Sequence, residues 1–435
     1  AAFGLRVQCN GVVDPPPAEP STCVSRAAAD RQQAAEVAQA LARAALLAAD
    51  EVDGDAARAL LRGTESIAGV GGAGVSPQTV RPDTATAHIW TPASIPTRGS
   101  AREVAAWWAA LPGEAQEALV GLQPDALGGL NGVPASVRHA ANVEVLERAS
   151  AEAQETMARA STAFGGPDLP AYLSALSRQS LVASVRSELA GDPQRRLLTL
   201  NFGDGGHAAV AVGDVDTARH VAILVPGLNA DARGDLDNLV GDAMTVQTTA
   251  KTVAPNESVA VVAWIGYRTP NLISVLLSKR AQAGGKRLAA FTRGVDEARA
   301  MARVGRGSPD PFHLTVVGHS YGSHATAEAL ERTDVVDDAV FLGSPGVDQL
   351  HSRQLIKGGG HLYVAEAGDD GYADLGGWFR QDPSWRGFGA IPLPTGGAMI
   401  DDRWWEASHG HSEYYTPGTE SVRRIAGVVL GTPVG

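Results

Sequence analysis

The chain has 435 residues, a length that corresponds to about two or three domains and allows a large hydrophobic core. Its net charge of −12 and sequence pI near 5.4 leave no basic excess to neutralise phosphates, so we expect no nucleic-acid partner and no anionic membrane partner. No run of about 18 apolar residues occurs, so we expect no membrane span either.

The N-terminal segment holds both cysteines of the chain, Cys9 and Cys23, on either side of a proline-rich stretch. The pair forms either one disulfide, which implies an oxidising compartment, or two free thiols. A start at Ala1 without Met fits an exported mature protein or a trimmed chain. We therefore expect a secreted or cell-envelope-associated protein, with the cytoplasm as the alternative. Neither cysteine has a CxxC partner, so we predict no zinc or other metal site and no cofactor.

Residues 1–190 form a predicted α-helical N-terminal region. Ala28–Arg62 is rich in good helix formers, and the Gly/Ser/Pro stretch Gly69–Pro82 indicates a loop or linker. Helical patterns return over Val104–Ser161, with prolines that set helix starts, and again over Ala171–Leu189.

Residues 191–435 show the pattern of an α/β domain. Leu197–Phe202 and Ala208–Val212 flank a Gly-rich turn and predict an antiparallel hairpin. Short apolar strands and helices then alternate, as a parallel sheet covered on both faces requires. The predicted strands are Val221–Val225, Val259–Trp264, Leu314–Val317, Ala339–Leu342 and His361–Ala365, and the predicted helices are Leu236–Thr252, Lys286–Val304, His324–Arg332 and Glu420–Leu430. A hairpin that leads into such a sheet opens the alpha/beta-hydrolase fold, which we predict for this domain.

The stretch Gly318-His319-Ser320-Tyr321-Gly322 lies between a predicted strand and a predicted helix. In that context Gly-x-Ser-x-Gly marks a sharp turn that exposes the serine hydroxyl, and the glycines let strand and helix approach each other. The same pattern arises by chance in a Gly-rich chain, so the remaining residues have to supply the partners. We predict Ser320 as a nucleophile.

A serine nucleophile needs a base that is itself oriented by an acid, and in this fold the chain order is Ser, acid, His. After the strand His361–Ala365 the candidate acids are Asp370, then Asp369, with Asp374 as a remote option. A solvated acidic loop is the alternative. Before the last helix, His411 is the preferred base, and His409 is the alternative.

The oxyanion of a tetrahedral intermediate needs two backbone N–H donors. We predict the N–H of Tyr321, which follows the nucleophile, and that of Leu228 in the turn after Val221–Val225. Further predicted substrate-binding residues are Asn229, Trp264, Tyr267, His319 and Ser344, although core packing explains Trp264 equally well. An aromatic-rich segment, Asp374–Trp405, either closes over the site or packs.

With these residues in view, the chain resembles an actinobacterial family of alpha/beta hydrolases of the Gly-His-Ser-Tyr-Gly type. The resemblance lies in the sequence words Val221–Gly227, Val261–Tyr267, Leu314–Ser323, Leu342–Val347 and His411-Ser412. It implies Ser320 as nucleophile, an Asp of the 369–370 pair as acid and His411 as base. Where the family commonly has Asp-Pro-Ile-Ala, this chain has Asp370-Gly371-Tyr372-Ala373.

We therefore expect a serine hydrolase that cleaves a carboxylic ester or a related acyl bond of a small-molecule or lipid-like substrate through a Ser-His-Asp triad. The same triad cleaves amides, so an exopeptidase or amidase is the rival chemistry. The alternative from another class is a secreted binding or assembly protein with a vestigial hydrolase domain. The sequence indicates no oligomeric state.

Overall fold

The computed structural model describes residues 95–161, 168–269, 278–306, 312–357, 359–371, 373 and 380–432, together with two short paired strands, β1 (Arg6–Val7) and β2 (Val13–Asp14). The predicted helix Ala28–Arg62, the predicted linker and the two cysteines lie outside the described residues. Residues 92–270 and 277–435 form one compact unit.

The centre of this unit is an eight-stranded sheet in the order β10-β9-β8-β7-β5-β6-β4-β3. Strand β4 runs antiparallel to both of its neighbours, β3 and β6, and β5 to β10 are parallel to one another. The strands are β3 (Arg196–Asn201), β4 (His207–Val212), β5 (His220–Val225), β6 (Val259–Ile265), β7 (His313–His319), β8 (Asp338–Leu342), β9 (His361–Ala365) and β10 (Ile391–Leu393). This mostly parallel sheet confirms the predicted alpha/beta-hydrolase fold.

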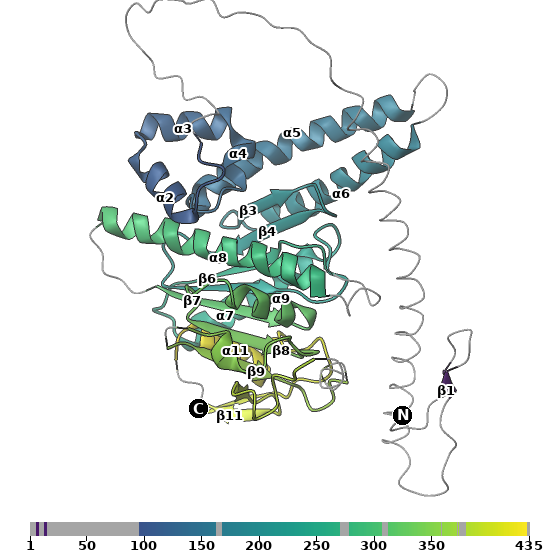
Figure 1. Cartoon of the computed structure of the whole chain (residues 1–435), viewed down its shortest axis with the longest axis vertical. Coiled ribbons are helices and arrows are strands. Elements are labelled where there is room, and N and C mark those ends of the chain that lie inside the picture. Colours follow the sequence, from purple (N-terminus) through teal and green to yellow (C-terminus); the bar gives the residue numbers. More distant parts are fainter. Residues whose placement is uncertain are drawn as a thin grey trace, which may run out of the picture. The chain divides into compact units, whose positions relative to one another are not determined.

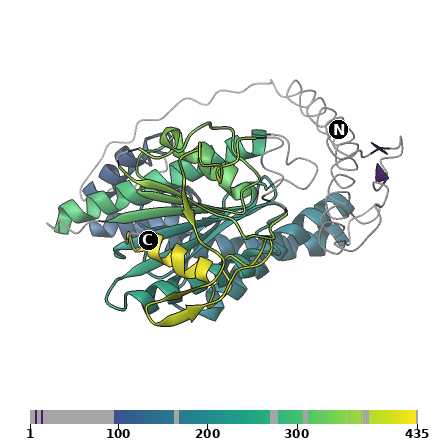
Figure 2. The ribbon, with the colours of Figure 1, turned by 90° about the horizontal axis from the view of Figure 1, so that it is seen from below.

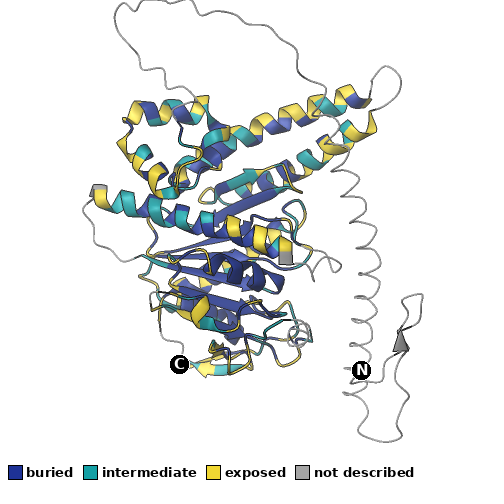
Figure 3. Ribbon diagram, viewed as in Figure 1, coloured by how far each residue is buried: buried dark blue, intermediate teal, exposed yellow. Residues whose placement is uncertain are grey.

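Helices cover both faces of the sheet (Figures 1 and 2). On one face α7 (Leu236–Val253) packs against α11 (Glu420–Val429), and on the other α8 (Ser278–Arg306) packs against α9 (Tyr321–Leu330). The strands between them are almost entirely buried, as the dark blue ribbons of Figure 3 show. Continuous runs of Val, Ile, Leu and Ala suit this double coverage, because neither side of a strand meets water.

Among the described residues, five helices precede the sheet: α2 (Ala101–Ala110), α3 (Gly113–Leu122), α4 (Pro124–Gly128), α5 (Ala135–Ser161) and α6 (Leu169–Gly191). Their starts follow local rules: Ser100 and Glu103 form a capping box at α2, Pro124 opens α4, and Asp168 caps α6. The antiparallel pair α5 and α6 packs against the hairpin strand β3. These helices belong to the same compact unit as the sheet, so residue 190 marks a change of secondary structure within one packed body.

The segment before α11 adds a small antiparallel pair, β11 (Ala398–Ile400) and β12 (Arg403–Trp405), and a 3-10 turn, η2 (Ser352–Gln354), follows β8. Within the described residues, no helix combines the length and apolar character that crossing a bilayer needs.

Candidate active site

The loops that follow β5, β7, β8 and β9 all leave the same edge of the sheet, because these strands are parallel. Open α/β sheets bind their ligands at this carboxyl edge. The candidate residues Leu228, Ser320, Ser344 and Asp370 lie in these four loops, and His411 reaches the edge from the segment before α11.

Ser320 occupies a sharp turn between β7 and α9. Its φ of 55° and ψ of −131° are a conformation that residues other than glycine rarely adopt. The N–H of Ser320 donates to the carbonyl of Leu342 over 2.8 Å. A Cβ on Gly318 would lie 2.7 Å from the carbonyl oxygen of Gly322, so the turn requires glycine there.

The side chains of Asp370 and His411 form a hydrogen-bonded pair beside this turn. The Nδ1 atom of His411 lies 2.9 Å and 3.0 Å from the two carboxylate oxygens of Asp370. The His411 ring packs 4.8 Å, between centroids, from the ring of His319, the residue before Ser320. Asp370, His411 and the Ser320 turn therefore come from three separate loops to one place.

Asp370 is buried and nevertheless favours its charged form. Burial alone raises the pKa of a carboxyl group, but hydrogen bonds from His411 and Tyr414 outweigh burial and lower the pKa of Asp370 below its usual value. The Tyr414 hydroxyl donates to Oδ2 of Asp370 over 2.6 Å and accepts from the N–H of Ala367 over 3.0 Å. Gly343, with φ of 52°, completes this packing, because a Cβ there would lie 2.5 Å from the same oxygen.

His319 contacts the loop that carries His411. Its Nε2 atom lies 2.7 Å from the carbonyl oxygen of His411, so Nε2 carries the proton in this bond. Burial, together with the neighbouring His411 ring, lowers the pKa of His319 to about 4, and the ring is neutral at neutral pH. His319 thus contacts His411 directly.

Asp369, the alternative acid, contacts other groups. It accepts a hydrogen bond from the N–H of Gly410 over 2.7 Å, and its Oδ2 lies 3.4 Å from Nδ1 of His409. Both side chains of this second pair are exposed. Asp369 therefore anchors the loop next to His411, while the third candidate, Asp374, lies outside the described residues.

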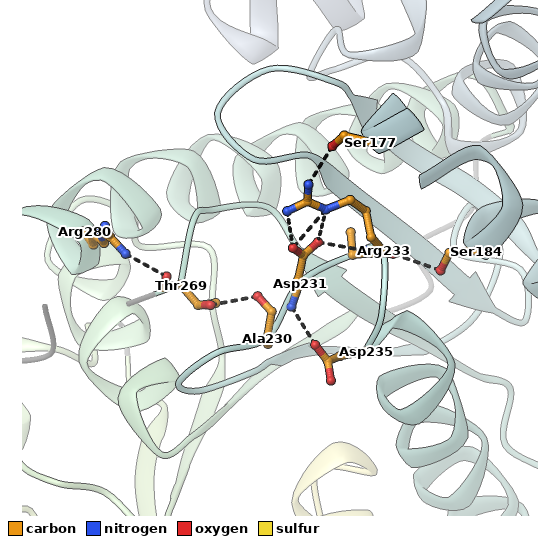
Figure 4. A network of polar contacts seen from close by, with 9 residues as sticks. Ser177, Ser184, Ala230, Asp231, Arg233, Asp235, Thr269 and Arg280 are labelled. Atoms are coloured by element: carbon orange, nitrogen blue, oxygen red, sulfur yellow. Dashed lines mark hydrogen bonds and ion pairs between the residues drawn. The ribbon is translucent and has the colours of Figure 1, made fainter. Parts of the chain in front are cut away.

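The β5–α7 loop (residues 226–235) contacts the Ser320 turn. A Cβ on Gly227 would lie 2.5 Å from Cβ of Ser320 and 3.0 Å from its Oγ. Leu228, the next residue, is half-buried, and Asn229 is exposed with φ of 60°. The rest of the loop forms the polar network of Figure 4, in which Asp231 and Arg233 pair with each other.

The remaining predicted binding residues lie in the packing around the loops. Trp264 is buried in β6 against Tyr267 and Phe291, so it contributes to the core. Tyr267 is also buried and donates its hydroxyl to the carbonyl of Pro226 over 2.8 Å.

Ser344 lies beneath the turn that carries Ser320. Its Oγ atom is 2.6 Å from Oγ of Ser323, and Ser323 donates to the carbonyl of Ser320 over 2.7 Å. Ser344 is buried, so it supports the turn from below. In the aromatic-rich segment, Trp385 and Trp404 are exposed and Trp405 is buried.

Sequence reasoning missed Tyr414, Gly343 and Ser323. Ser323 and Gly343 lie within the sequence words Leu314–Ser323 and Leu342–Val347, so position relative to a strand end was the available signal. Tyr414 carried no signal of its own, because its role depends on where the loop folds back.

One cluster among the described residues brings three potential metal ligands together, His324, Glu328 and Asp348. Arg332 pairs with Glu328 at 2.8 Å, and Arg380 pairs with Asp348 at 2.5 Å. Burial lowers the pKa of His324 to about 4. The two guanidinium groups already balance both carboxylates, so an ion-pair network accounts for this cluster.

Two hollows, of about 680 and 500 Å³, open at the opposite edge of the sheet. The first is lined by Arg196 and Arg299 among others, and the second by His313, Asp338 and His361. The strands β3, β7, β8 and β9 place these residues away from Ser320. Neither of these two hollows therefore belongs to the candidate site, which is identified by the contacts among Ser320, His319, Asp370 and His411.

The sheet and its helices have the fold of an alpha/beta hydrolase, and comparison with known proteins agrees. The profile of a family described as "Alpha/beta hydrolase" matches residues 203–377. The uncharacterized protein Mb0988c of Mycobacterium bovis is 31% identical over 231 residues, which are 49% of this chain and 79% of that protein. The chain therefore belongs to the alpha/beta hydrolase family.

One relative matches over a longer stretch, and solved structures match at lower identity. The uncharacterized protein Rv2079 of Mycobacterium tuberculosis is 31% identical over 385 residues, and the match spans 78% of this chain but only 57% of that protein. Among solved structures, an esterase of Pyrobaculum calidifontis matches with 15% identity and a TM-score of 0.32, over 60% of this chain and 93% of that one. The metagenomic carboxylesterase EstE1 matches with 15% identity and a TM-score of 0.32, over 59% and 94%. Scores of this size carry no argument about activity.

Proposed function

We propose that the protein is a serine hydrolase that cleaves a carboxylic ester or related acyl bond, with Ser320 as nucleophile, His411 as base and Asp370 as acid. The observation that carries the proposal is the contact of a buried, charged Asp370 with His411 beside the strained turn of Ser320. Structural packing alone does not require a carboxylate, an imidazole and a serine from three loops at one sheet edge.

The proposed reaction follows from these positions. Ser320 Oγ attacks the acyl carbon, and Nε2 of His411 takes the hydroxyl proton. The Nδ1–H group of His411 meanwhile keeps its proton and its hydrogen bond to the Asp370 carboxylate. The oxyanion forms near the N–H groups of Tyr321, the first residue of α9, and Leu228. Collapse of the tetrahedral intermediate expels the alcohol, which receives the proton from His411, and leaves an acyl group on Ser320. Water then attacks this ester by the same steps and regenerates the serine.

The test compares wild type with Ser320→Ala on a p-nitrophenyl butyrate assay and on covalent labelling by a fluorophosphonate. We expect wild type to label and turn over, and Ser320→Ala to lose at least about 1,000-fold in kcat and all labelling. Ser174→Ala, at an exposed serine of α6, serves as the matched control and should behave as wild type.

A wild-type protein that neither labels nor hydrolyses any short acyl ester would contradict the proposal. A panel of peptide amides run beside the esters separates an esterase from an amidase that uses the same residues.

A further inference from the structure

The β5–α7 loop is held from outside by hydroxyl groups of two other segments. After β6, Tyr267 donates to the carbonyl of Pro226 over 2.8 Å, and Thr269 donates to that of Ala230 over 2.7 Å. From α6, Ser184 donates to the carbonyl of Ala232 over 2.9 Å (Figure 4). Each bond fixes a main-chain carbonyl of the loop, so together they restrict its backbone rather than a side chain.

Arg233 supplies a second link from the loop to α6. Its Nε lies 2.8 and 2.9 Å from the two carboxylate oxygens of Asp231, and one terminal nitrogen pairs with the same carboxylate. The other terminal nitrogen, Nη1, donates to Oγ of Ser177 over 2.6 Å (Figure 4). The fork on Asp231 fixes the plane of the guanidinium, and this plane aims Nη1 at α6.

Helix α6 is a fixed anchor for these links. Leu181, Val182 and Val185 of α6 are buried in the same apolar cluster as the strands of the sheet. Ser177 and Ser184 are seven residues apart, which is about two helical turns, so both hydroxyls lie on one side of α6. Because α6 is fixed by its packing in the core, a loop that is hydrogen-bonded to this side of α6 is held in a fixed position relative to the core.

The other end of the loop touches Ser320. Gly227 is so close that an added Cβ would lie 2.5 Å from Cβ of Ser320. Leu228, whose N–H is the proposed oxyanion donor, stands between this contact and the bonds to Ala230, Ala232 and Arg233. A shift at the α6 end therefore moves the Leu228 N–H relative to the nucleophile.

We infer that Arg233, Ser177 and Ser184 are positioning residues that hold the Leu228 N–H in register with Ser320. This inference rests on the proposed function and extends it. It also assigns a task to the helices before the sheet, because α6 then supports the part of the site that stabilises the developing negative charge.

The expected effect falls on kcat. Removal of a whole oxyanion donor costs about 100- to 1,000-fold in kcat, so its displacement by a fraction of an ångström should cost less, about 5- to 30-fold. Substrate binding in the ground state does not use the developing charge, so KM should stay within about twofold. Alanine is a better helix former than serine, and this gain offsets the lost hydrogen bonds, so the melting temperature should change little.

The experiment uses the full chain with p-nitrophenyl butyrate, a fluorophosphonate and thermal unfolding. The test variant is Ser177→Ala/Ser184→Ala, and the matched control is Ser174→Ala/Ser180→Ala, two exposed serines of the same helix. Ser177→Thr/Ser184→Thr keeps both hydroxyls and should restore most of the rate. Arg233→Lys keeps the charge but lacks the forked guanidinium, so its kcat should fall as that of the alanine pair does.

The supporting result is a 5- to 30-fold lower kcat and labelling rate for the alanine pair, with KM and melting temperature unchanged and the control pair at wild-type rate. A test pair within twofold of wild type overturns the inference alone. A fall of kcat together with melting temperature also overturns it, in favour of a purely structural role. Wild type without labelling or turnover overturns the inference and the proposed function together.

Discussion

At the scale of single residues, the charge on Asp370 depends on two donors of different kinds. His411 donates from an imidazole that has to change its protonation state in the proposed reaction, whereas Tyr414 donates from a buried phenol. Burial raises the pKa of Tyr414 well above its usual value, so this proton stays in place throughout. Tyr414 is thus a constant source of stabilisation for the charged acid.

Replacement of Tyr414 by Phe removes one hydrogen bond to Asp370 and keeps the ring. Burial is then opposed by fewer hydrogen bonds, so the pKa of Asp370 rises from its lowered value towards its usual one. A carboxyl group with a lowered pKa stays charged until the pH falls through that pKa. If the pKa of Asp370 is higher in the variant, Asp370 loses its charge at a higher pH. We expect the activity of Tyr414→Phe to decline at a higher pH than that of wild type when the pH is lowered from 7.

The measurement is kcat/KM against pH on p-nitrophenyl butyrate, with Tyr415→Phe as the control. Tyr415 is also buried but does not contact Asp370 in the described part of the chain. Profiles for Tyr414→Phe and wild type that coincide on the acid side would contradict this role.

Sequence order alone was enough to nominate Ser320, Asp370 and His411, since each follows or precedes a recognisable strand or helix. The choice between Asp370 and Asp369 required the fold, because the two are adjacent in the chain and point to different histidines. Trp264 was a candidate from its place at a strand end, but burial puts it in the core. Whether a strand-end side chain turns inward depends on its tertiary neighbours.

At the scale of elements, the amino ends of the central strands carry a row of charged and polar residues. His220 begins β5, His313 begins β7, Asp338 begins β8 and His361 begins β9. Nε2 of His313 lies 3.0 Å from Asp338, and its Nδ1 lies 3.1 Å from the carbonyl oxygen of Val429. Both partners only accept hydrogen bonds, so the geometry requires a doubly protonated ring.

This geometry predicts a pH dependence of stability. Burial alone lowers the pKa of His313, but the hydrogen bond and charge of Asp338 outweigh burial and raise it above 6.5. A raised histidine pKa stabilises the fold fully below the unfolded value of about 6.5, and the contribution is lost as the pH rises through the folded value. We expect wild type to lose stability relative to His313→Gln as the pH rises above 6.5.

The measurement is the free energy of unfolding in urea for both proteins between pH 5.5 and 9. The comparison with the variant cancels groups that lie away from this row, and both proteins keep His220, whose ring lies edge-on to His313, and His361, which contacts Asp338. A difference between the two proteins that does not change with pH would contradict a charged His313.

The sequence located most elements to within a few residues, because buried strands and amphipathic helices have strong patterns. Helix α8 is the instructive exception. It begins at Ser278 and not at the predicted Lys286, and the missed part contains Gly284 and Gly285. Glycine disfavours helix, but here its lack of a side chain is required, because a Cβ on Gly285 would lie 2.4 Å from Cβ of Glu328 in α9. Close helix packing overrode local propensity.

At the scale of the whole molecule, one apolar cluster joins the helices before the sheet to the sheet itself. Leu146 of α5 and Leu181 of α6 are in this cluster together with Leu197 of β3 and Val210 of β4. The hydroxyl bonds from α6 to the β5–α7 loop run across the same boundary. The change of pattern near residue 190 is therefore not a place where the chain divides into independent bodies.

Two truncated proteins test this view. A fragment of residues 92–435 retains the whole compact unit and should unfold in one cooperative thermal transition. A fragment of residues 191–435 exposes the apolar faces that α5 and α6 cover, so we expect it to aggregate or to lack a cooperative transition. Circular dichroism and size-exclusion chromatography provide the measurements, and a monomeric, cooperatively folded 191–435 fragment would contradict the shared core.

The order of strands in the sheet also bears on how the protein is made. The hairpin β3–β4 pairs with β6, although β5 comes first along the chain, since β5 lies between β6 and β7. On a ribosome the hairpin and the two long helices beside it emerge before Val259–Ile265 exist. Their apolar surfaces thus stay without the partner strand β6 during the synthesis of some fifty residues, which takes about 3 to 10 seconds at common translation rates. In that interval a chaperone has both the time and the surface to bind the nascent chain.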